Sequence, residues 1–325
     1  MGRALVYVSR EIPDKGLEIL DDFFEIKMND KGRKLSKREL IEEAKEADAL
    51  LTLLSDKVDK EVMSELKNLK VIANYAVGYN NIDLEEATKR GIIVTNTPDV
   101  LTETTADLTF ALVLASARRI VETDKLLRNG DFDGWAPKLF LGKEVNHKTL
   151  GIIGLGRIGQ AVAKRAKAFN MEVIYNKRNR LKKSKESELG IKYKKFEDLL
   201  KISDYITINA PLNESTYHMF GKKEFKLMKE DSFIINTGRG PIINEKELVE
   251  ALKNEEIAGC GLDVYENEPE VEKDLINFDN VVLTPHIGSA TYEARDEMAE
   301  LAAKGAISGY KRESANNIVN DELLD

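Results

Sequence analysis

The fold is decided by the stretch Thr149-Leu150-Gly151-Ile152-Ile153-Gly154-Leu155-Gly156-Arg157-Ile158-Gly159. An apolar strand runs into three glycines with the spacing G-x-G-x-x-G, and a helix is expected over 160–169. The first glycine permits a tight turn, the second lets backbone approach a pyrophosphate, and the third packs helix on strand. We therefore expect residues 154–159 to hold the phosphates of a dinucleotide. A plain strand-to-helix turn is the competing interpretation.

Further apolar runs follow this loop and alternate with helical patterns. They lie at 172–176, 205–209, 232–236, 260–264 and 281–284. Six strands of this length, with helices between them, predict a complete doubly wound dinucleotide-binding fold.

The first third of the chain repeats the pattern with apolar runs at 4–8, 49–54, 71–75 and 92–95. Between them lie amphipathic segments, and Ser36 and Glu39 have the spacing of a helix capping box. We expect hinges after Thr97-Pro98 and around 287–291, with a helix over 291–310 returning to the first sheet. The predicted fold class is α/β, with two doubly wound parallel-sheet domains and a cleft between them.

The expected boundaries make one domain continuous and the other discontinuous. A Rossmann nucleotide-binding domain spans 99–289, and a smaller flavodoxin-like substrate domain combines 1–98 with 290–325. A chain of 325 residues fits two hydrophobic cores.

The amino-acid composition limits the classes of partner that this protein is expected to bind. The net charge of -8 argues against a nucleic-acid surface, because phosphate binding needs a basic face. No run approaches the roughly 20 apolar residues that cross a bilayer, so no membrane partner is expected. The N-terminus lacks the pattern of a signal peptide, and Cys260 is the single cysteine. We expect a cytoplasmic protein.

The residues after the second nucleotide-domain strand bear on the cofactor. Asp or Glu there usually accepts hydrogen bonds from the adenosine ribose, but this chain has Asn176-Lys177-Arg178. From residue 177 to 185 there are six basic residues and no acidic one. Arg178 suits a 2′-phosphate, so we expect NADP(H) to be preferred, with NAD(H) as the alternative. Lys182, Lys183 and Lys185 are interpreted as solvated surface.

Three ionisable side chains follow apolar strands late in the chain. They are Arg239 in Asn236-Thr237-Gly238-Arg239-Gly240, Glu268 in Asn267-Glu268-Pro269, and His286 in Thr284-Pro285-His286-Ile287-Gly288. Parallel strands end at one sheet edge, so the three side chains are expected to meet there. His147 and His218 are interpreted as surface or capping residues, with His218 at a helix start.

This set matches the needs of 2-oxo acid reduction. The substrate carboxylate needs a cation, and the developing alkoxide needs a proton. Arg239 offers a planar permanent charge, and an imidazole such as His286 titrates nearest neutral pH. Glu268 would favour the imidazolium and hold its ring. Taken singly, each residue could be a surface charge. No metal site is expected.

These motifs resemble the D-isomer-specific 2-hydroxyacid dehydrogenases, and in particular their glyoxylate/hydroxypyruvate reductase branch. The similarity covers nearly the whole chain, including 77–83, 97–103, 261–264 and 284–290. The order and spacing of arginine, glutamate and histidine also match.

The resemblance implies roles for individual residues. His286 would be the proton donor, Glu268 its partner and Arg239 the substrate anchor. The backbone at Val77 and Gly78 would hold the substrate carboxylate, with Leu53 and Leu54 near the substrate. The cofactor-binding residues implied outside the glycine loop and the 176–178 segment are Thr104, Pro211, Thr216, Thr237, Gly238, Arg239, Asp263, His286 and Gly288. Asp263 would face the nicotinamide carboxamide, and Thr104 would lie beside the ring.

The segment 118–148 resembles the arm through which this family dimerises, so a homodimer is expected. Trp135 there could be a buried anchor or a residue lent to the neighbouring active site, and plain packing is the favoured interpretation. The stretch 135–142 resembles the glyoxylate reductase branch. Because the chain ends at Asp325, no regulatory domain is expected.

Taken together, the sequence predicts an NADPH-dependent reductase of glyoxylate, hydroxypyruvate or both. Two alternatives stay open. One is an NAD-dependent dehydrogenase of another D-2-hydroxy acid, of the phosphoglycerate or D-lactate type. The other is a nicotinamide-sensing regulator built on the same fold.

Overall fold

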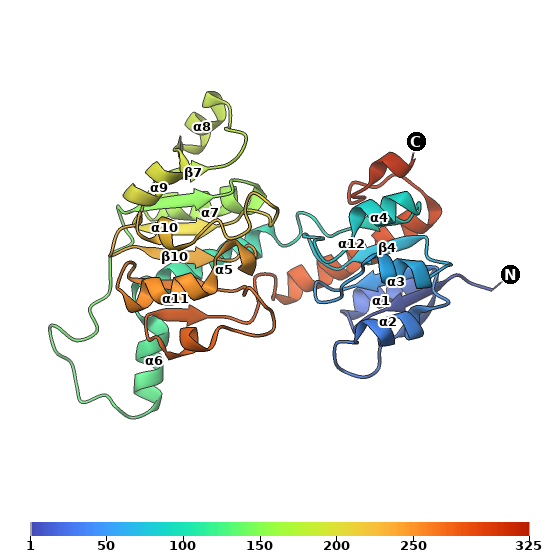
Figure 1. The fold of residues 1–325 in the computed structure, drawn as a ribbon, viewed down its shortest axis with the longest axis horizontal. Coiled ribbons are helices and arrows are strands. Elements are labelled where there is room, and N and C mark those ends of the chain that lie inside the picture. The colour runs from blue at the N-terminus through green and yellow to red at the C-terminus, as the bar shows by residue number, and fades with distance from the viewer. Residues whose placement is uncertain (1, 325) are drawn as a thin grey trace. The chain divides into compact units, whose positions relative to one another are not determined.

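The computed structural model describes residues 2–324, and the chain divides into two compact units. Unit 1 combines Met1–Leu101 with Ala290–Asp325, and unit 2 is Thr102–Ser289. Each unit has its own parallel sheet with helices packed on it (Figure 1). The predicted α/β class with two parallel-sheet domains is confirmed.

The sheet of unit 1 has five parallel strands in the order β2-β1-β3-β4-β5. Their bounds are β1 Leu5–Val8, β2 Glu25–Met28, β3 Ala49–Thr52, β4 Val71–Asn74 and β5 Ile93–Thr95. This strand order is the flavodoxin-like one. The sequence did not reveal β2, because this edge strand is mostly exposed and lacks an apolar run.

The helices of unit 1 are α1 Asp14–Asp21, α2 Lys37–Ala44, α3 Lys60–Glu65, α4 Leu84–Lys89, α12 Tyr292–Lys311 and the short 3-10 turn η3 Asp321–Leu324. Helix α12 returns the chain to the sheet, and Thr291 caps its first turn by accepting from the Ala294 N–H. It packs closely, because a Cβ on Gly309 would lie 2.5 Å from Val71 and one on Gly305 would lie 2.6 Å from Thr95.

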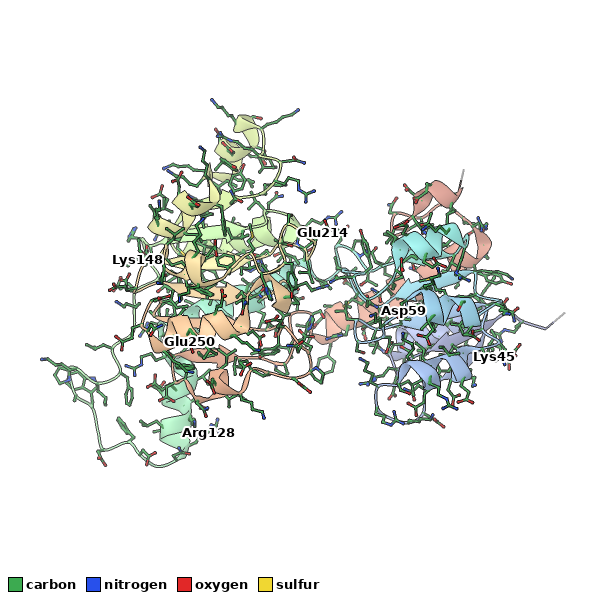
Figure 2. The ribbon with its side chains drawn as sticks, viewed as in Figure 1. Lys45, Asp59, Arg128, Lys148, Glu214 and Glu250 are labelled. Carbon is green, nitrogen blue, oxygen red and sulfur yellow. The ribbon has the colours of Figure 1, made fainter. Side chains whose placement is uncertain are left out.

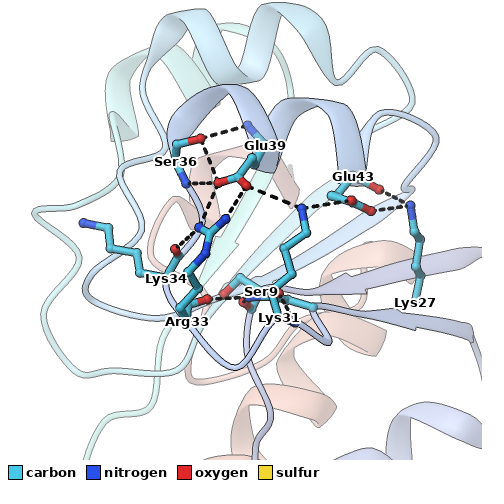
Figure 3. A network of polar contacts seen from close by, with 9 residues as sticks. Ser9, Lys27, Lys31, Arg33, Lys34, Ser36, Glu39 and Glu43 are labelled. Atoms are coloured by element: carbon cyan, nitrogen blue, oxygen red, sulfur yellow. Dashed lines mark hydrogen bonds and ion pairs between the residues drawn. The ribbon is translucent and has the colours of Figure 1, made fainter.

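Helix α2 begins at the predicted capping box. Ser36 accepts from the Glu39 N–H while the Glu39 carboxylate accepts from the Ser36 N–H, so this prediction is confirmed. Glu39 also forms an ion pair with Arg33, and Glu43 pairs with Lys27 and Lys31. Figure 3 shows this surface network. The bonds from Arg33 and Ser36 hold the pKa of Glu39 far below its usual range.

The sheet of unit 2 has seven parallel strands in the order β12-β11-β10-β9-β6-β7-β8. Their bounds are β6 Thr149–Ile153, β7 Glu172–Asn176, β8 Lys192–Tyr193, β9 Tyr205–Ile208, β10 Phe233–Asn236, β11 Gly259–Leu262 and β12 Val281–Leu283. Six of these strands match the apolar runs. The seventh, β8, has two residues and no apolar pattern by which it could be recognised.

The helices of unit 2 are α5 Thr102–Ala117, α6 Ile120–Arg128, α7 Arg157–Ala168, α8 Lys183–Leu189, α9 Phe196–Ile202, α10 Lys222–Phe225 and α11 Glu245–Lys253, with 3-10 turns η1 Gly240–Ile242 and η2 Lys273–Asn277. Helix α7 begins three residues earlier than expected, inside the glycine motif. Apolar side chains fill both faces of the sheet, with Ile234 and Leu248 on one and Leu150 and Val162 on the other.

Residues 118–148 are called the arm below. Helix α6 and the loop after it extend away from the rest of unit 2 (Figure 1), and Lys143 and Val145 pack back against it. Arg128, at the end of α6, and Lys148, at the end of the arm, are labelled in Figure 2. Trp135 on the arm is 81% exposed. The favoured interpretation of plain packing for Trp135 is therefore wrong for the single chain, because the arm has no core of its own.

Among residues 2–324, no helix is both long and apolar enough to span a lipid bilayer. Within the same range, no group of three His, Cys, Asp or Glu side chains is arranged to hold a metal ion.

Candidate active site

The glycine loop joins β6 to α7, and its three glycines differ in their surroundings. Gly154 has a φ of 87°, and a Cβ there would lie 2.6 Å from the Ala210 backbone nitrogen. A Cβ on Gly159 would overlap the Gly154 carbonyl oxygen, so this glycine lets the helix pack on the loop. A Cβ on Gly156, by contrast, would have no other atom within 4 Å. The loop is closed on its protein side and open at Gly156, next to the N-terminus of α7.

The segment after β7 carries the residues that are expected to bind the adenosine end of the cofactor. Asn176 donates to the Lys194 carbonyl, which ties it to the neighbouring edge strand. Lys177 Nζ lies 3.5 Å from the Leu155 carbonyl oxygen, so its charge reaches back over the glycine loop. Arg178 is exposed and donates to Ser215 Oγ at 3.3 Å. Two cationic side chains, Lys177 and Arg178, therefore follow β7. A carboxylate in their place would repel a 2′-phosphate.

A tight turn after β9 holds two further predicted residues together. Thr216 Oγ1 donates to the Pro211 carbonyl at 2.8 Å and accepts from the Asn213 N–H at 2.8 Å. The same turn presents Ser215 to Arg178.

Thr237, after β10, belongs to a chain of buried polar groups. Its hydroxyl lies 2.7 Å from that of Thr109 on α5, and Thr109 donates to the Thr105 carbonyl. Asn209 Nδ2 donates to Thr237 at 3.4 Å, while Asn209 Oδ1 is buried without a hydrogen-bond partner. Sequence reasoning missed Thr109 and Asn209, because a polar residue inside an apolar run carries no motif. Thr104 lies half-buried on the first turn of α5.

Three neighbouring strands end beside one another and are followed by the three ionisable residues. Arg239 follows β10, Glu268 follows β11, and His286 follows β12; these strands are adjacent in the sheet. The register pairs Asn236 with Leu262 and Leu262 with Leu283, so the three strands end level.

His286 and Glu268 are in direct contact. His286 Nδ1 lies 2.9 Å from Glu268 Oε2, and the Tyr265 N–H donates to Glu268 Oε1 at 3.1 Å. Burial of Glu268 raises its pKa, but the hydrogen bonds and the charges of His286 and Arg239 together bring it below its ordinary value. Glu268 is therefore an ionised acceptor that fixes one nitrogen of the imidazole, Nδ1.

Asp263 is buried just after β11 and holds the loop that carries His286. Its carboxylate accepts from Thr284 Oγ1 at 2.6 Å, from the Ile287 N–H at 2.8 Å and from the Gly288 N–H at 2.8 Å. Burial raises the pKa of Asp263, and these three bonds oppose the rise. The residue therefore anchors the turn, a function that the sequence did not reveal.

Arg239 is set by the turn that follows β10. Asn236 donates through its side chain to the Arg239 carbonyl at 3.0 Å and accepts from the Gly238 N–H at 3.0 Å. The guanidinium donates to the Gly238 carbonyl at 2.8 Å. Burial lowers the pKa of Arg239, and the charge of Glu268 opposes that shift. An arginine stays protonated under such shifts, so the site keeps a positive charge.

The predicted substrate residues Leu53, Val77 and Gly78 lie in unit 1, in the loops after β3 and β4. Asparagine side chains tie these loops together. Asn81 donates to the Leu53 carbonyl at 3.1 Å, Asn74 to the Gly78 carbonyl at 2.8 Å, and Asn96 to the Val77 carbonyl at 2.8 Å. The carbonyls point into this network. Leu54 is half-buried beside Leu53.

The other two histidines lie apart from His286. His147 is exposed in the loop before β6. His218 sits in a turn with a φ of 48°, and no helix begins there, so its expected place at a helix start is wrong. Its Nε2 lies 2.7 Å from Glu266 Oε1.

The chain is similar to known proteins. The model of the D-isomer specific 2-hydroxyacid dehydrogenase NAD binding domain matches residues 110–288. A glyoxylate reductase from Thermococcus litoralis is 53% identical over 323 residues, which are 98% of this chain and 97% of that protein.

Two solved structures are also similar over their whole length. A glyoxylate reductase from Paecilomyes thermophila is 35% identical with a TM-score of 0.88, covering 99% of this chain and 100% of that one. An NADPH-dependent glyoxylate/hydroxypyruvate reductase from Sinorhizobium meliloti, in complex with NADP and malonate, is 31% identical with a TM-score of 0.88, covering 98% of both chains. The protein therefore belongs to the D-isomer specific 2-hydroxyacid dehydrogenase family, and its similarity is to the glyoxylate reductase branch.

Proposed function

We propose that this protein reduces glyoxylate and hydroxypyruvate to the 2-hydroxy acids, with NADPH as the electron donor. The observation that carries the proposal is the set at the level ends of β10, β11 and β12, where His286 is bonded to Glu268 and Arg239 keeps a positive charge nearby. Relatives with this activity in their names support the choice of substrate.

Each residue of the set has one task. Arg239 binds the substrate carboxylate, for which its planar fork is suited. His286 donates a proton from Nε2 to the carbonyl oxygen, and Glu268 holds the ring and stabilises the imidazolium. The bound cofactor would supply the hydride for the carbonyl carbon. In unit 1, the backbone at Val77 and Gly78 binds the same carboxylate, and Leu53 and Leu54 border the substrate.

The cofactor residues of the proposal fall into two groups. The phosphates lie on 154–159, and the nicotinamide half lies against Thr104, Thr237, Gly238, Asp263, His286 and Gly288. Open space at Gly156 supports the first placement. The adenosine end lies on Asn176, Lys177 and Arg178, with Pro211 and Thr216 in the turn beside them.

NADPH is proposed over NADH because of the charges after β7. Arg178 and Ser215 are already in contact there, and Lys177 lies over the loop. A phosphate would meet two cations and a hydroxyl, which is how proteins bind such groups.

A matrix of NADPH and NADH against glyoxylate, hydroxypyruvate, pyruvate and phosphohydroxypyruvate tests the activity by the loss of nicotinamide absorbance. We expect the highest kcat/KM for NADPH with glyoxylate or hydroxypyruvate. The highest value for phosphohydroxypyruvate or pyruvate with NADH would assign the protein to the alternative dehydrogenases. Cofactor binding without turnover of any of the four acids would favour a regulator.

The cofactor preference is tested separately with Arg178→Asp. A carboxylate in place of the guanidinium repels the 2′-phosphate, so KM for NADPH should rise by about 10-fold or more while KM for NADH changes little. Lys182→Asp on the neighbouring exposed surface is the matched control. Equal changes in both KM values for Arg178→Asp contradict the assignment.

A homodimer formed through the arm is also proposed. Its support is the set of large apolar side chains that the arm exposes, namely Ile120, Val121, Leu127, Phe132, Trp135, Leu139 and Leu141. Sedimentation should give twice the chain mass of 36.6 kDa, and Trp135→Ser with Leu141→Ser should shift it toward the monomer. A monomeric wild-type protein at micromolar concentration would refute it.

We also place the protein in the cytoplasm, since its one cysteine, Cys260, is a buried free thiol. Cell fractionation tests this location.

A further inference from the structure

Residues 264–268 carry Glu268 although they form neither helix nor strand. A reciprocal pair of carboxylates holds this segment to the first turn of α11. The Glu266 N–H donates to Glu245 Oε1 at 2.7 Å, and the Glu245 N–H donates to Glu266 Oε2 at 3.2 Å. Each acid thus binds the backbone of the other, two residues from Glu268.

The same pair is linked to the turn that carries Arg239. His218 Nε2 lies 2.7 Å from the second oxygen of Glu266, and the His218 N–H donates to the Pro241 carbonyl at 2.8 Å. Gly240, between Arg239 and Pro241, packs so tightly that a Cβ would overlap the Tyr265 carbonyl group. His218 therefore connects the segment after β11 with the segment after β10.

Burying the carboxylate of Glu245 costs free energy, which argues against a purely structural role for the pair. Glu245 is 5% exposed, and burial raises its pKa. The nearby carboxylates of Glu266 and Glu272 raise it further, while N–H groups of the same two residues oppose this. A well-packed apolar side chain could fill the space without a desolvation cost. It could not accept the Glu266 N–H, which is the bond that fixes the segment.

We propose that Glu245, Glu266 and His218 form a clamp that positions Glu268 against His286 and sets its separation from Arg239. These three are positioning residues, because none of them touches His286 in the structure. The inference rests on the proposed function, since it assigns the clamp to the reductase site.

Two variants of Glu245 separate positioning from packing. Glu245→Ala removes the acceptor of the Glu266 N–H, so kcat for glyoxylate with NADPH should fall by about 10- to 100-fold, as a misplaced catalytic group costs. KM for NADPH should stay close to that of the wild type. Glu245→Gln keeps an acceptor oxygen at the same place and should retain kcat within about threefold. Glu250→Ala, on the exposed side of the same helix and labelled in Figure 2, is the control.

A second position guards against loss of folding in Glu245→Ala. His218→Phe removes the bond to Glu266 while keeping an aromatic ring for the stack with Tyr217. This half-buried site should tolerate the change, and kcat should fall by roughly 3- to 10-fold. Thermal melts of all variants identify any loss of kcat that merely follows the unfolded fraction.

A readout independent of turnover distinguishes this inference from the proposed function. The chain has three histidines, so the Nδ1 proton of His286 is assignable in a spectrum of ¹⁵N-histidine-labelled protein. We expect slow exchange of this proton in the wild type and Glu245→Gln, and loss of its signal in Glu245→Ala. A persistent signal in folded Glu245→Ala overturns the clamp, whether or not the protein reduces glyoxylate. Absence of any 2-oxo acid reduction by the wild type refutes the proposed function alone.

Discussion

Both units contain a parallel sheet, but the residues that follow the carboxyl ends of the strands differ between the two. In unit 2 the level ends of β10, β11 and β12 are followed by Arg239, Glu268 and His286, side chains that carry or exchange charge. In unit 1 the loops after β3, β4 and β5 are joined by the amides of Asn74, Asn81 and Asn96. The sheet edge of unit 2 therefore carries ionisable side chains. The sheet edge of unit 1 carries loops whose backbone carbonyls are bonded by asparagine side chains.

Carboxamides and ionisable side chains differ in their acid–base chemistry. A carboxamide does not titrate, so the bonds of Asn74 and Asn81 keep the same strength across the physiological pH range. An imidazole bonded to a carboxylate can give up a proton while its ring stays fixed. Under the proposed function, the loops of unit 1 would bind the substrate and the side chains of unit 2 would transfer the proton. The predictions below separate these two tasks.

The largest effect is expected from His286→Ala in unit 2. Loss of the general acid should lower kcat for glyoxylate by at least about 100-fold, because the variant lacks the imidazole that would supply the proton. KM should change much less. Steady-state kinetics measures both. His147→Ala, which removes an exposed histidine from the same unit, should leave kcat unchanged. A His286→Ala enzyme with near-normal kcat would remove the basis for the assigned roles.

A smaller effect of another kind is expected from Asn81→Ala in unit 1. This change deletes the bonds to the carbonyls of Leu53 and Asp56 and to the side chain of Asn74. The loops should loosen, so that KM for glyoxylate rises by roughly 3- to 10-fold with little change in kcat. Ser55→Ala, an exposed change in the loop after β3 to which Asn81 is bonded, is the control. A fall in kcat at constant KM would show that the two edges do not divide the work in this way.

Much of the fold could be predicted from sequence because buried parallel strands are short apolar runs. Six strands of unit 2 and four of unit 1 are recognisable in this way. The strands β2 and β8 are not, because neither contains an apolar run. A strand without an apolar run is defined by its pairing with a neighbouring backbone, which a local pattern does not contain.

The candidate site is predictable where a residue directly follows an apolar run, as Arg239 and His286 do. The residues that hold these groups are not predictable. Asp263 binds backbone N–H groups at residues 287 and 288, and Glu245 binds that of Glu266, so their partners are distant in sequence. The prediction for His218 is wrong because its neighbours resemble a helix start, whereas they form a turn from which no helix begins.

The smallest expected effect is on thermal stability, which should depend on pH for the sheet edge of unit 2 but not for that of unit 1. The pKa of Glu268 lies below its ordinary value of 4.5, so the folded protein binds this proton less readily than the unfolded chain does. The carboxylate therefore contributes stability that is complete above the unfolded pKa and is lost as the pH falls through the folded pKa. Because the Glu268 side chain is 38% exposed, Glu268→Gln should lower Tm by only about 2–4 °C at neutral pH. Thermal melts should show this difference shrinking as the pH falls through the folded pKa of Glu268, where the glutamate side chain becomes neutral like that of glutamine. The Tm difference for Asn81→Ala should stay constant over the same range, since no ionisable side chain is removed. A Glu268→Gln difference that is equally constant would mean that the carboxylate of Glu268 is not stabilised by the charges around it.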